Sequence, residues 1–286
     1  VPVICVGNLT AGGAGKTPVV IDLARRLSAA GLSPHVVSRG YGAATGAEPR
    51  RVVPATDGAD RVGDEPLMIA RTAPVWVGGG RVAAARAAAA GGAGSVILDD
   101  GFQDPSVTKD LSLVVADGHY GFGNGRMIPA GPLREPIAAG LDRAGAVVVL
   151  GEDTWGVAQA VHDQGPPGLS VLAARVAPGP EIANLARTRL FAFAGIGHPD
   201  KFFATLRDGG GTLAGTRAFA DHHPFTGADL DALAQAAAAR QARLVTTEKD
   251  LMRLPPERRA GIEVLTITLQ WDDEAALDRL LRTVKP

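Results

Sequence analysis

Thr10-Ala11-Gly12-Gly13-Ala14-Gly15-Lys16-Thr17 lies between an apolar run at residues 1–6 and a stretch with helical spacing that begins at Pro18. A strand, a glycine-rich turn that ends in Gly-Lys-Thr, and a helix form the arrangement by which a backbone wraps polyphosphate. The glycines let N–H groups converge on phosphate oxygens, Lys16 reaches the outer phosphates, and the Thr17 hydroxyl can ligate magnesium. The usual pattern has glycine where this chain has Thr10. The segment predicts a nucleotide-binding P-loop; the alternative is a glycine-rich loop without a ligand.

The composition bounds the class of protein. At roughly 150 residues per domain, 286 residues predict two domains or one large one. Hydrophobic residues make up 46% and aromatic residues only 5%, which favours an α/β core of alanine, valine and leucine. The net charge of −1 gives no global attraction to nucleic acid, which we do not expect as a partner. No apolar stretch approaches the ~18 residues of a membrane span, so the chain as given is expected to be soluble.

The alternation of strand and helix patterns predicts the organisation of the chain. Strands are expected at residues 1–6, 35–38, 74–77, 95–99, 111–116 and 146–150, with helices between most of them. This pattern predicts a P-loop NTPase-like, doubly wound, mostly parallel α/β sheet over residues 1–150. Glycine- and proline-rich breakers indicate a connecting segment at 151–186, and alternation resumes in a second, smaller α/β domain at 187–286. Its last elements are expected to be a strand at 262–269 and a helix at 273–282.

Acidic residues follow the apolar run at 96–98. Asp99 and Asp100 stand where phosphate-binding NTPases hold the acid that positions magnesium, although Asp100 could instead cap a turn before Gly101. Asp64, before Glu-Pro, is by itself explained as a helix N-cap. His222 and His223 are by themselves explained as loop residues, because no further cysteine or histidine supplies a zinc site. The single cysteine, Cys5, lies in the first strand and is expected to be a buried thiol.

Two further segments contain charged residues. The loop at 126–136 is rich in proline and glycine and ends in Arg134 and Glu135, which offer a fork for a phosphate and an oxygen for a metal. The alternative is a solvated turn with an ion pair. The segment at 246–250 reads TTEKD, which has lysine and aspartate one position away from the guanine-reading motif, so guanine specificity is unsupported.

Seven short motifs occur in one order along the chain. They are GNLT at 7–10 running into GGAGKTP at 12–18, SRGYG at 38–42, GDEP at 63–66, LDDGFQ at 98–103, PAGPLREP at 129–136, DHH at 221–223 and TTEKD at 246–250. Together they closely resemble the tetraacyldisaccharide 4'-kinase family, the lipid A 4'-kinases, over nearly the whole chain. The family tolerates threonine at the position of Thr10.

The resemblance implies two α/β domains with the active site in the cleft between them. It also implies a magnesium-dependent transfer of the γ-phosphoryl group of ATP to the 4'-hydroxyl of a tetraacylated glucosamine disaccharide 1-phosphate, which gives lipid IVA. The lipid disaccharide is thus the expected partner, at the cytoplasmic face of the bacterial inner membrane. Family members usually begin with an N-terminal helix that docks on this membrane, and the present chain starts after that helix would end.

The resemblance also implies roles for individual residues. Asp64 works with His222 as the base for the sugar hydroxyl, while Lys16 offsets charge on the transferring phosphoryl group and Asp99 acts near magnesium. The remaining carry-overs are Thr10 to Thr17 for the nucleotide, Thr17, Asp99, Asp100 and Glu135 for the metal, and Arg81, Arg134, Tyr41 and Gln103 for substrate or phosphate. One departure is that the family commonly has histidine at the position of Asp104.

Two other functions remain open at this point. One is a P-loop kinase that acts on another amphipathic or sugar acceptor. The other is a nucleotide-switch ATPase driven by a protein partner; such proteins carry a lysine just before the Gly-Gly pair, where this chain has Ala11.

Overall fold

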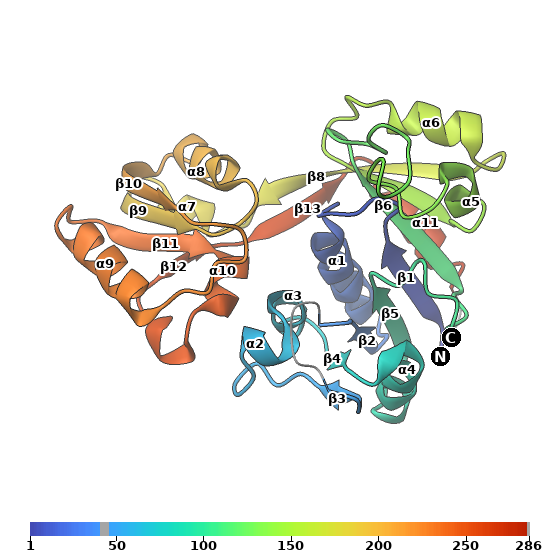
Figure 1. Ribbon diagram of the computed structural model, residues 1–286, viewed down its shortest axis with the longest axis horizontal. Coiled ribbons are helices and arrows are strands. Elements are labelled where there is room, and N and C mark those ends of the chain that lie inside the picture. Colours follow the sequence, from blue (N-terminus) through green and yellow to red (C-terminus); the bar gives the residue numbers. More distant parts are fainter. Residues whose placement is uncertain (41–45, 285–286) are drawn as a thin grey trace.

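The computed structural model describes residues 1–40 and 46–284, which form two β-sheets with their helices (Figure 1). The larger sheet has nine strands in the order β13-β8-β7-β6-β1-β5-β2-β4-β3. Its strands are β1 (Val3–Gly7), β2 (Pro34–Val37), β3 (Arg50–Arg51), β4 (Val75–Val77), β5 (Ser95–Asp99), β6 (Leu111–Asp117), β7 (Ala146–Leu150), β8 (Ser170–Pro178) and β13 (Ile267–Trp271). All neighbours in it are parallel except β13 with β8 and β3 with β4.

Helices cover both faces of the large sheet, because its strands alternate apolar side chains between two cores. Ile4 and Ile97 point to one core and Cys5 and Leu98 to the other, and all four are fully buried. The first core is covered by α1 (Lys16–Ala29), α3 (Asp64–Ile69) and α11 (Glu274–Leu281), and the second by α4 (Gly80–Ala90), α5 (Ile137–Leu141) and α6 (Val157–Gln164). The short helix α2 (Ala59–Val62) precedes α3. The predicted doubly wound α/β class is confirmed.

The smaller sheet has four parallel strands in the order β10-β9-β11-β12. Its elements are β9 (Arg189–Ala194), β10 (Thr212–Ala218), β11 (Arg243–Thr247), β12 (Glu263–Leu265), α7 (Ile182–Leu185), α8 (Pro199–Asp208), α9 (Gly227–Ala238), α10 (Glu248–Arg253) and a 3₁₀ turn at Pro256–Arg258. Its two faces carry separate cores, with Leu190 and Leu206 in one and Phe193 and Leu233 in the other. The smaller α/β unit predicted from the sequence is therefore present.

The boundaries predicted for the second unit are wrong in two respects. The segment at 151–186 is more than a connection, because it supplies α6 and the large-sheet strand β8. The strand expected at 262–269 is two strands, and β13 leaves the small sheet to pair with β8. The chain then packs against α1, where the Trp271 indole N–H donates to Asp22 over 2.8 Å. Periodicity detects strands but does not say which sheet they join.

Two strands connect the two sheets, as Figure 1 shows for β8 and β13. They are tied to each other where they leave the large sheet. The Gly179 N–H donates to the Thr266 carbonyl over 2.8 Å, and the Thr266 hydroxyl donates to the Glu181 carboxylate over 2.9 Å. None of the helices within residues 1–40 and 46–284 has the length and apolar character needed to span a bilayer.

The close packing around β1 leads to a stability prediction. A methyl group added at Gly7 would lie 2.4 Å from Cβ of Phe102, which no rotamer change of Phe102 relieves. We expect Gly7→Ala to lower the free energy of unfolding by about 1–3 kcal/mol, as overpacking does. Urea denaturation measures this change. The control is Gly227→Ala, where an added methyl meets nothing within 4 Å; equal stability of the two variants would contradict the packing argument.

Candidate active site

The P-loop lies between β1 and α1, as the sequence predicts. Gly15 has a left-handed backbone (φ 78°), which favours glycine, and the helix begins at Lys16. The loop is fixed from outside by the Ala11 N–H, which donates to the Pro132 carbonyl over 2.7 Å. It is fixed from inside by the Asn8 side chain, which donates to the Thr10 carbonyl over 2.7 Å. The N–H groups at the start of α1 and the lysine therefore form one preorganised anion cradle.

Asp100 connects the cradle to the end of β5. Its carboxylate lies 3.4 Å from Lys16 Nζ and 3.0 Å from Arg134 Nη1. Burial by itself would raise the pKa of Asp100, but the Lys16 and Arg134 cations lower it below its usual value. Its backbone is left-handed (φ 52°), which turns the chain sharply after the strand. Asp100 is therefore an ionised carboxylate that lies between the Lys16 and Arg134 cations.

Asp99 is buried beside the cradle, at 3% exposure. It pairs in register with Val6 of β1, and its carboxylate accepts a hydrogen bond of 2.9 Å from the Ser38 hydroxyl. Burial, and after it the nearby Glu65 carboxylate, raise the pKa of Asp99 to about 6. A buried carboxylate with so little positive charge around it is well suited to hold a cation.

The raised pKa of Asp99 predicts that its ionised carboxylate lowers the stability of the fold. Because the pKa of Asp99 rises from its ordinary value of 3.8 to about 6 in the folded protein, the free energy of unfolding falls as pH rises between these two values. Asp99→Asn removes this penalty, so we expect it to stabilise the fold by about 1–3 kcal/mol at about pH 8 and by less at about pH 5. Thermal unfolding at both pH values measures the difference. A variant that is less stable than the wild type at the higher pH would contradict the burial argument.

The predicted metal ligands are only partly brought together. Thr17 is the second residue of α1, after Lys16, while Asp99 ends β5 and Asp100 follows it. Glu135 is bound instead by both oxygens to Arg143, at 2.8 and 2.9 Å. Among the residues that the structure describes, no group of three or more His, Cys, Asp or Glu side chains is arranged so that it could hold a metal ion by itself. A hydroxyl and two carboxylates nevertheless fit Mg²⁺, which usually takes one or two carboxylates and completes its shell with phosphate and water oxygens.

Three of the four predicted phosphate and substrate residues, Arg81, Gln103 and Arg134, line one pocket of about 520 Å³. Its walls are Arg39, Arg81, Asp100, Gln103, Asp104, Pro105 and Arg134. Arg81 is 6% exposed, donates to the Asp100 carbonyl, and its Nε has no hydrogen-bond partner among the described residues. Gln103 donates to the Asn8 carbonyl over 2.7 Å. Tyr41 lies outside the described residues.

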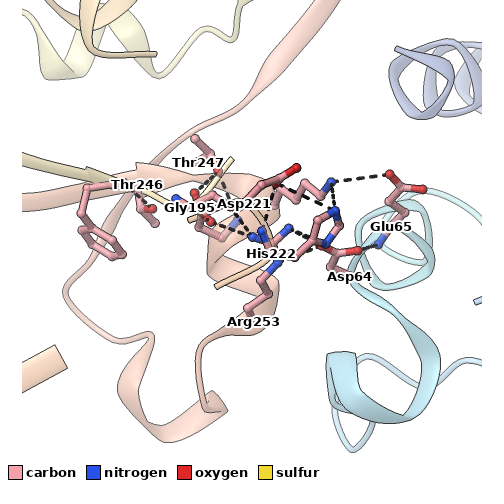
Figure 2. A network of polar contacts seen from close by, with 11 residues as sticks. Asp64, Glu65, Gly195, Asp221, His222, Thr246, Thr247 and Arg253 are labelled. Carbon is pink, nitrogen blue, oxygen red and sulfur yellow. Dashed lines mark hydrogen bonds and ion pairs between the residues drawn. The ribbon is translucent and has the colours of Figure 1, made fainter. Parts of the chain in front are cut away.

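Asp64 and His222 meet between the two sheets, although 158 positions separate them in the chain (Figure 2). Asp64 opens α3, and His222 lies in the loop between β10 and α9, with a left-handed backbone (φ 58°). His222 Nδ1 is 3.5 Å from Asp64 Oδ2. The other carboxylate oxygen accepts a hydrogen bond of 2.9 Å from the Glu65 N–H, but the N-cap of α3 is Gly63, so the N-cap expected at Asp64 is wrong by one position. The structure therefore brings together Asp64 and His222, the two residues expected to act as the general base.

Comparison with known proteins identifies the family of the chain. The family model described as tetraacyldisaccharide-1-P 4'-kinase matches residues 1–285. The chain belongs to this family. It is 54% identical to the tetraacyldisaccharide 4'-kinase of Rhodospirillum centenum over 282 residues, which cover 98% of this chain and 82% of that protein. It is also 54% identical to that of Paramagnetospirillum magneticum over 280 residues, or 98% and 85% of the two chains.

A solved structure shows the same fold. The crystal structure of LpxK from Aquifex aeolicus in complex with ATP has a TM-score of 0.75 to this chain and 25% sequence identity. The match covers 100% of this chain and 89% of the other. The predicted class of a P-loop kinase fold is thus confirmed, and the chain is a kinase of the tetraacyldisaccharide 4'-kinase family.

Asp104, which stands where the family commonly has histidine, forms an ion pair with Arg81. The Arg81 Nη1 donates to Asp104 Oδ2 over 2.9 Å. Hydrogen bonds from Ser106 and from the Arg81 guanidinium hold the pKa of Asp104 well below its usual range. The carboxylate is therefore ionised at neutral pH and restrains the arginine at the pocket wall, where histidine would carry no negative charge.

Cys5 and His223 are residues for which the sequence predicts no part in the reaction. Cys5 is fully buried, which confirms the expected buried thiol, and burial raises its pKa to about 12. His223 packs against Phe219 and Phe225, and its Nε2 lies 3.2 Å from Asp229, so it is a structural loop residue.

Arg253 is the residue of this site that the sequence analysis missed. It ends α10 and contacts both members of the Asp64–His222 pair (Figure 2). The only signal for it is the helical spacing from Asp250, which is fully buried and lies three positions earlier. The spacing of Asp250 and Arg253 indicates that the two residues lie on one face of a helix, but it does not indicate which other part of the protein that face contacts.

Proposed function

We propose that this chain transfers the γ-phosphoryl group of ATP to the 4'-hydroxyl of tetraacyldisaccharide 1-phosphate and so forms lipid IVA for lipid A biosynthesis. One observation carries the proposal: α1, which begins at the end of the P-loop, and α3, which begins at Asp64, pack against each other in one core. Glu65, next to Asp64 in α3, is close enough to Asp99 to raise its pKa. A nucleotide phosphate at the cradle and a hydroxyl at Asp64 would therefore be neighbours.

The donor side is proposed to work by positioning and charge. The loop N–H groups hold the nucleotide phosphates, Lys16 and Arg81 offset charge on the transferring group, and Arg134 adds a third cation at the pocket wall. Phosphoryl transfer asks little covalent chemistry of a protein, so most of the rate comes from alignment of donor and acceptor. The ATP in the Aquifex aeolicus structure supports this assignment.

The acceptor side is proposed to use Asp64 as general base. Its carboxylate takes the proton of the sugar hydroxyl, and His222, 3.5 Å away, fixes its orientation. Gln103 and Tyr41 are proposed to contact the substrate. Such a base typically contributes about 10² to 10⁴-fold.

A magnesium ion is proposed to complete the site. Thr17, Asp99, Asp100 and Glu135 would hold it, with Glu135 released from Arg143. The ion would supply positive charge to the phosphate oxygens. Because the acceptor is a membrane lipid, the protein is proposed to act peripherally at the cytoplasmic face of the inner membrane.

A phosphate-transfer assay with several acceptors tests the function. The protein is incubated with labelled ATP and Mg²⁺ and with the tetraacyldisaccharide 1-phosphate, its deacylated disaccharide or an unrelated glycolipid. We expect label only in the tetraacylated acceptor. Equal or faster labelling of another acceptor would assign the kinase to a different substrate, and ATP hydrolysis without any labelled acceptor would favour a nucleotide switch.

A further inference from the structure

Arg253 makes more polar contacts than the proposed mechanism uses. Its Nη1 donates to the Gly195 carbonyl over 2.7 Å and to Asp250 Oδ1 over 3.1 Å. Its Nε and Nη2 both donate to Asp64 Oδ2, over 2.8 and 2.5 Å. Nη2 also lies 3.2 Å from Nδ1 of His222. The guanidinium therefore contacts both Asp64 and His222, the two residues of the proposed general base.

The guanidinium is anchored on the small-sheet side. Asp250 is fully buried and accepts hydrogen bonds from the Gly195 N–H over 3.1 Å and the Thr247 hydroxyl over 2.7 Å. Gly195 follows β9 and Arg253 ends α10, so all of these contacts belong to the small-sheet unit. Figure 2 shows the arginine reaching from this unit toward α3. Because the guanidinium is planar and its Nη1 is held by Gly195 and Asp250, the direction of its Nε and Nη2 donors is fixed as well.

Asp64 is the group that this fork meets across the junction. The side chains of Arg253 and Asp64 are only 6% and 9% exposed, so the ion pair is shielded from water. Oδ1 of Asp64 is taken by the Glu65 N–H, which leaves Oδ2 as the oxygen shared by Arg253 and His222. The position of Oδ2 therefore depends on the small-sheet unit lying against the large one.

We infer that Arg253 is a positioning residue for the proposed transfer, which orients the Asp64 carboxylate against His222 and so assembles the base only when the two sheets are docked. The inference rests on the proposed function, because it concerns the base of that reaction. It gives a role to a residue that had none. It also means that residues from both the large-sheet and the small-sheet unit are needed to form the general base.

Charges around Asp64 give the inference a measurable signature. Burial raises the pKa of Asp64, but Lys249, Arg253 and His222 together lower it below its usual value. The other charged groups nearby are carboxylates: Glu65, which lies 3.7 Å from Lys249, Asp250 on α10, and Asp221, which lies 3.9 Å from His222. Loss of Arg253 removes a cation in direct contact, so the pKa of Asp64 rises. An active base must be ionised, so the acid limb of the pH–rate profile then moves to higher pH.

The test compares Arg253→Met and Arg253→Lys with the wild type and with Arg258→Met in the full chain. Arg258 pairs with Asp231 on the surface of the same unit, so its variant is a matched control. For Arg253→Met we expect kcat to fall by about 10- to 100-fold, an unchanged KM for ATP, and an acid limb at higher pH. Arg253→Lys keeps the charge but loses the fork, so we expect the limb near its wild-type position and only partial recovery of kcat.

Several outcomes would overturn the inference. Unchanged kcat in Arg253→Met, a lowered kcat with an unmoved acid limb, or wild-type kcat in Arg253→Lys would each show that the fork does not position the base. If Arg253→Met fails to fold, the lysine variant alone decides. Carbon-13 NMR titration of the Asp64 carboxyl group needs no acceptor, so it tests the inference even if the wild type phosphorylates no lipid, which would contradict the proposed function instead. A higher Asp64 pKa in the variant supports the inference, and an unchanged one refutes it.

Discussion

Lys16→Ala is expected to reduce phosphate transfer by about 10²–10³-fold and to raise the KM for ATP. Removal of one preorganised positive group from a developing negative charge typically has an effect of this size. Lys16 is 13% exposed in its side chain and lies 3.4 Å from Asp100, so its ammonium is held at the phosphate-binding edge and is not free in solvent. Initial-rate kinetics with varied ATP measure both parameters.

Lys201→Ala is the matched control for this variant. Lys201 is an exposed residue of α8 in the small-sheet unit, so its loss should leave the kinetics unchanged. If the Lys16 variant kept both its rate and its ATP dependence, the loop would not be the nucleotide cradle.

Asp64→Asn is expected to lower kcat by about 10² to 10⁴-fold with little change in ATP affinity. The amide keeps an oxygen for Arg253 but cannot accept the acceptor proton at neutral pH. Asp64→Ala should add a structural defect, because loss of one partner of a buried ion pair costs about 3–5 kcal/mol. A kinetic comparison of the two variants with their thermal unfolding midpoints separates chemistry from folding.

The control for Asp64 is Asp60→Ala, an exposed aspartate of the preceding helix α2. It should behave as the wild type in both measurements. Full activity in Asp64→Asn would assign the proton to another group, and a parallel loss of ATP affinity would point to a defect in the nucleotide site.

The sequence predicts the local parts of this molecule well. A strand, a glycine-rich turn and a helix follow one another within residues 3–29, so the cradle of Lys16 is encoded by neighbours in the chain. Asp99 and Asp100 are found from their own neighbours as well, because they follow directly after the apolar run at residues 96–98. These features require no knowledge of the tertiary arrangement.

Long-range features escape the same reasoning. The sheet to which β13 belongs depends on pairing with β8, about 90 positions earlier, and not on its own pattern. The pairing of Asp64 with His222 came only from resemblance to a family. No pattern in the sequence predicts the contact of Arg253 with Asp64, because the two residues are 189 positions apart in the chain. The bond of Glu135 to Arg143 likewise depends on which side chains the loop brings together.

The product of one incubation tests the central claim most directly. The protein, Mg²⁺ and ATP are combined with tetraacyldisaccharide 1-phosphate, and the lipid is analysed by mass spectrometry with assignment of the modified hydroxyl. We predict a lipid that has gained one phosphoryl group on the 4'-hydroxyl, and no such product with Lys16→Ala. An unmodified lipid in the presence of active protein, or a phosphoryl group on a different hydroxyl, would contradict the proposed reaction.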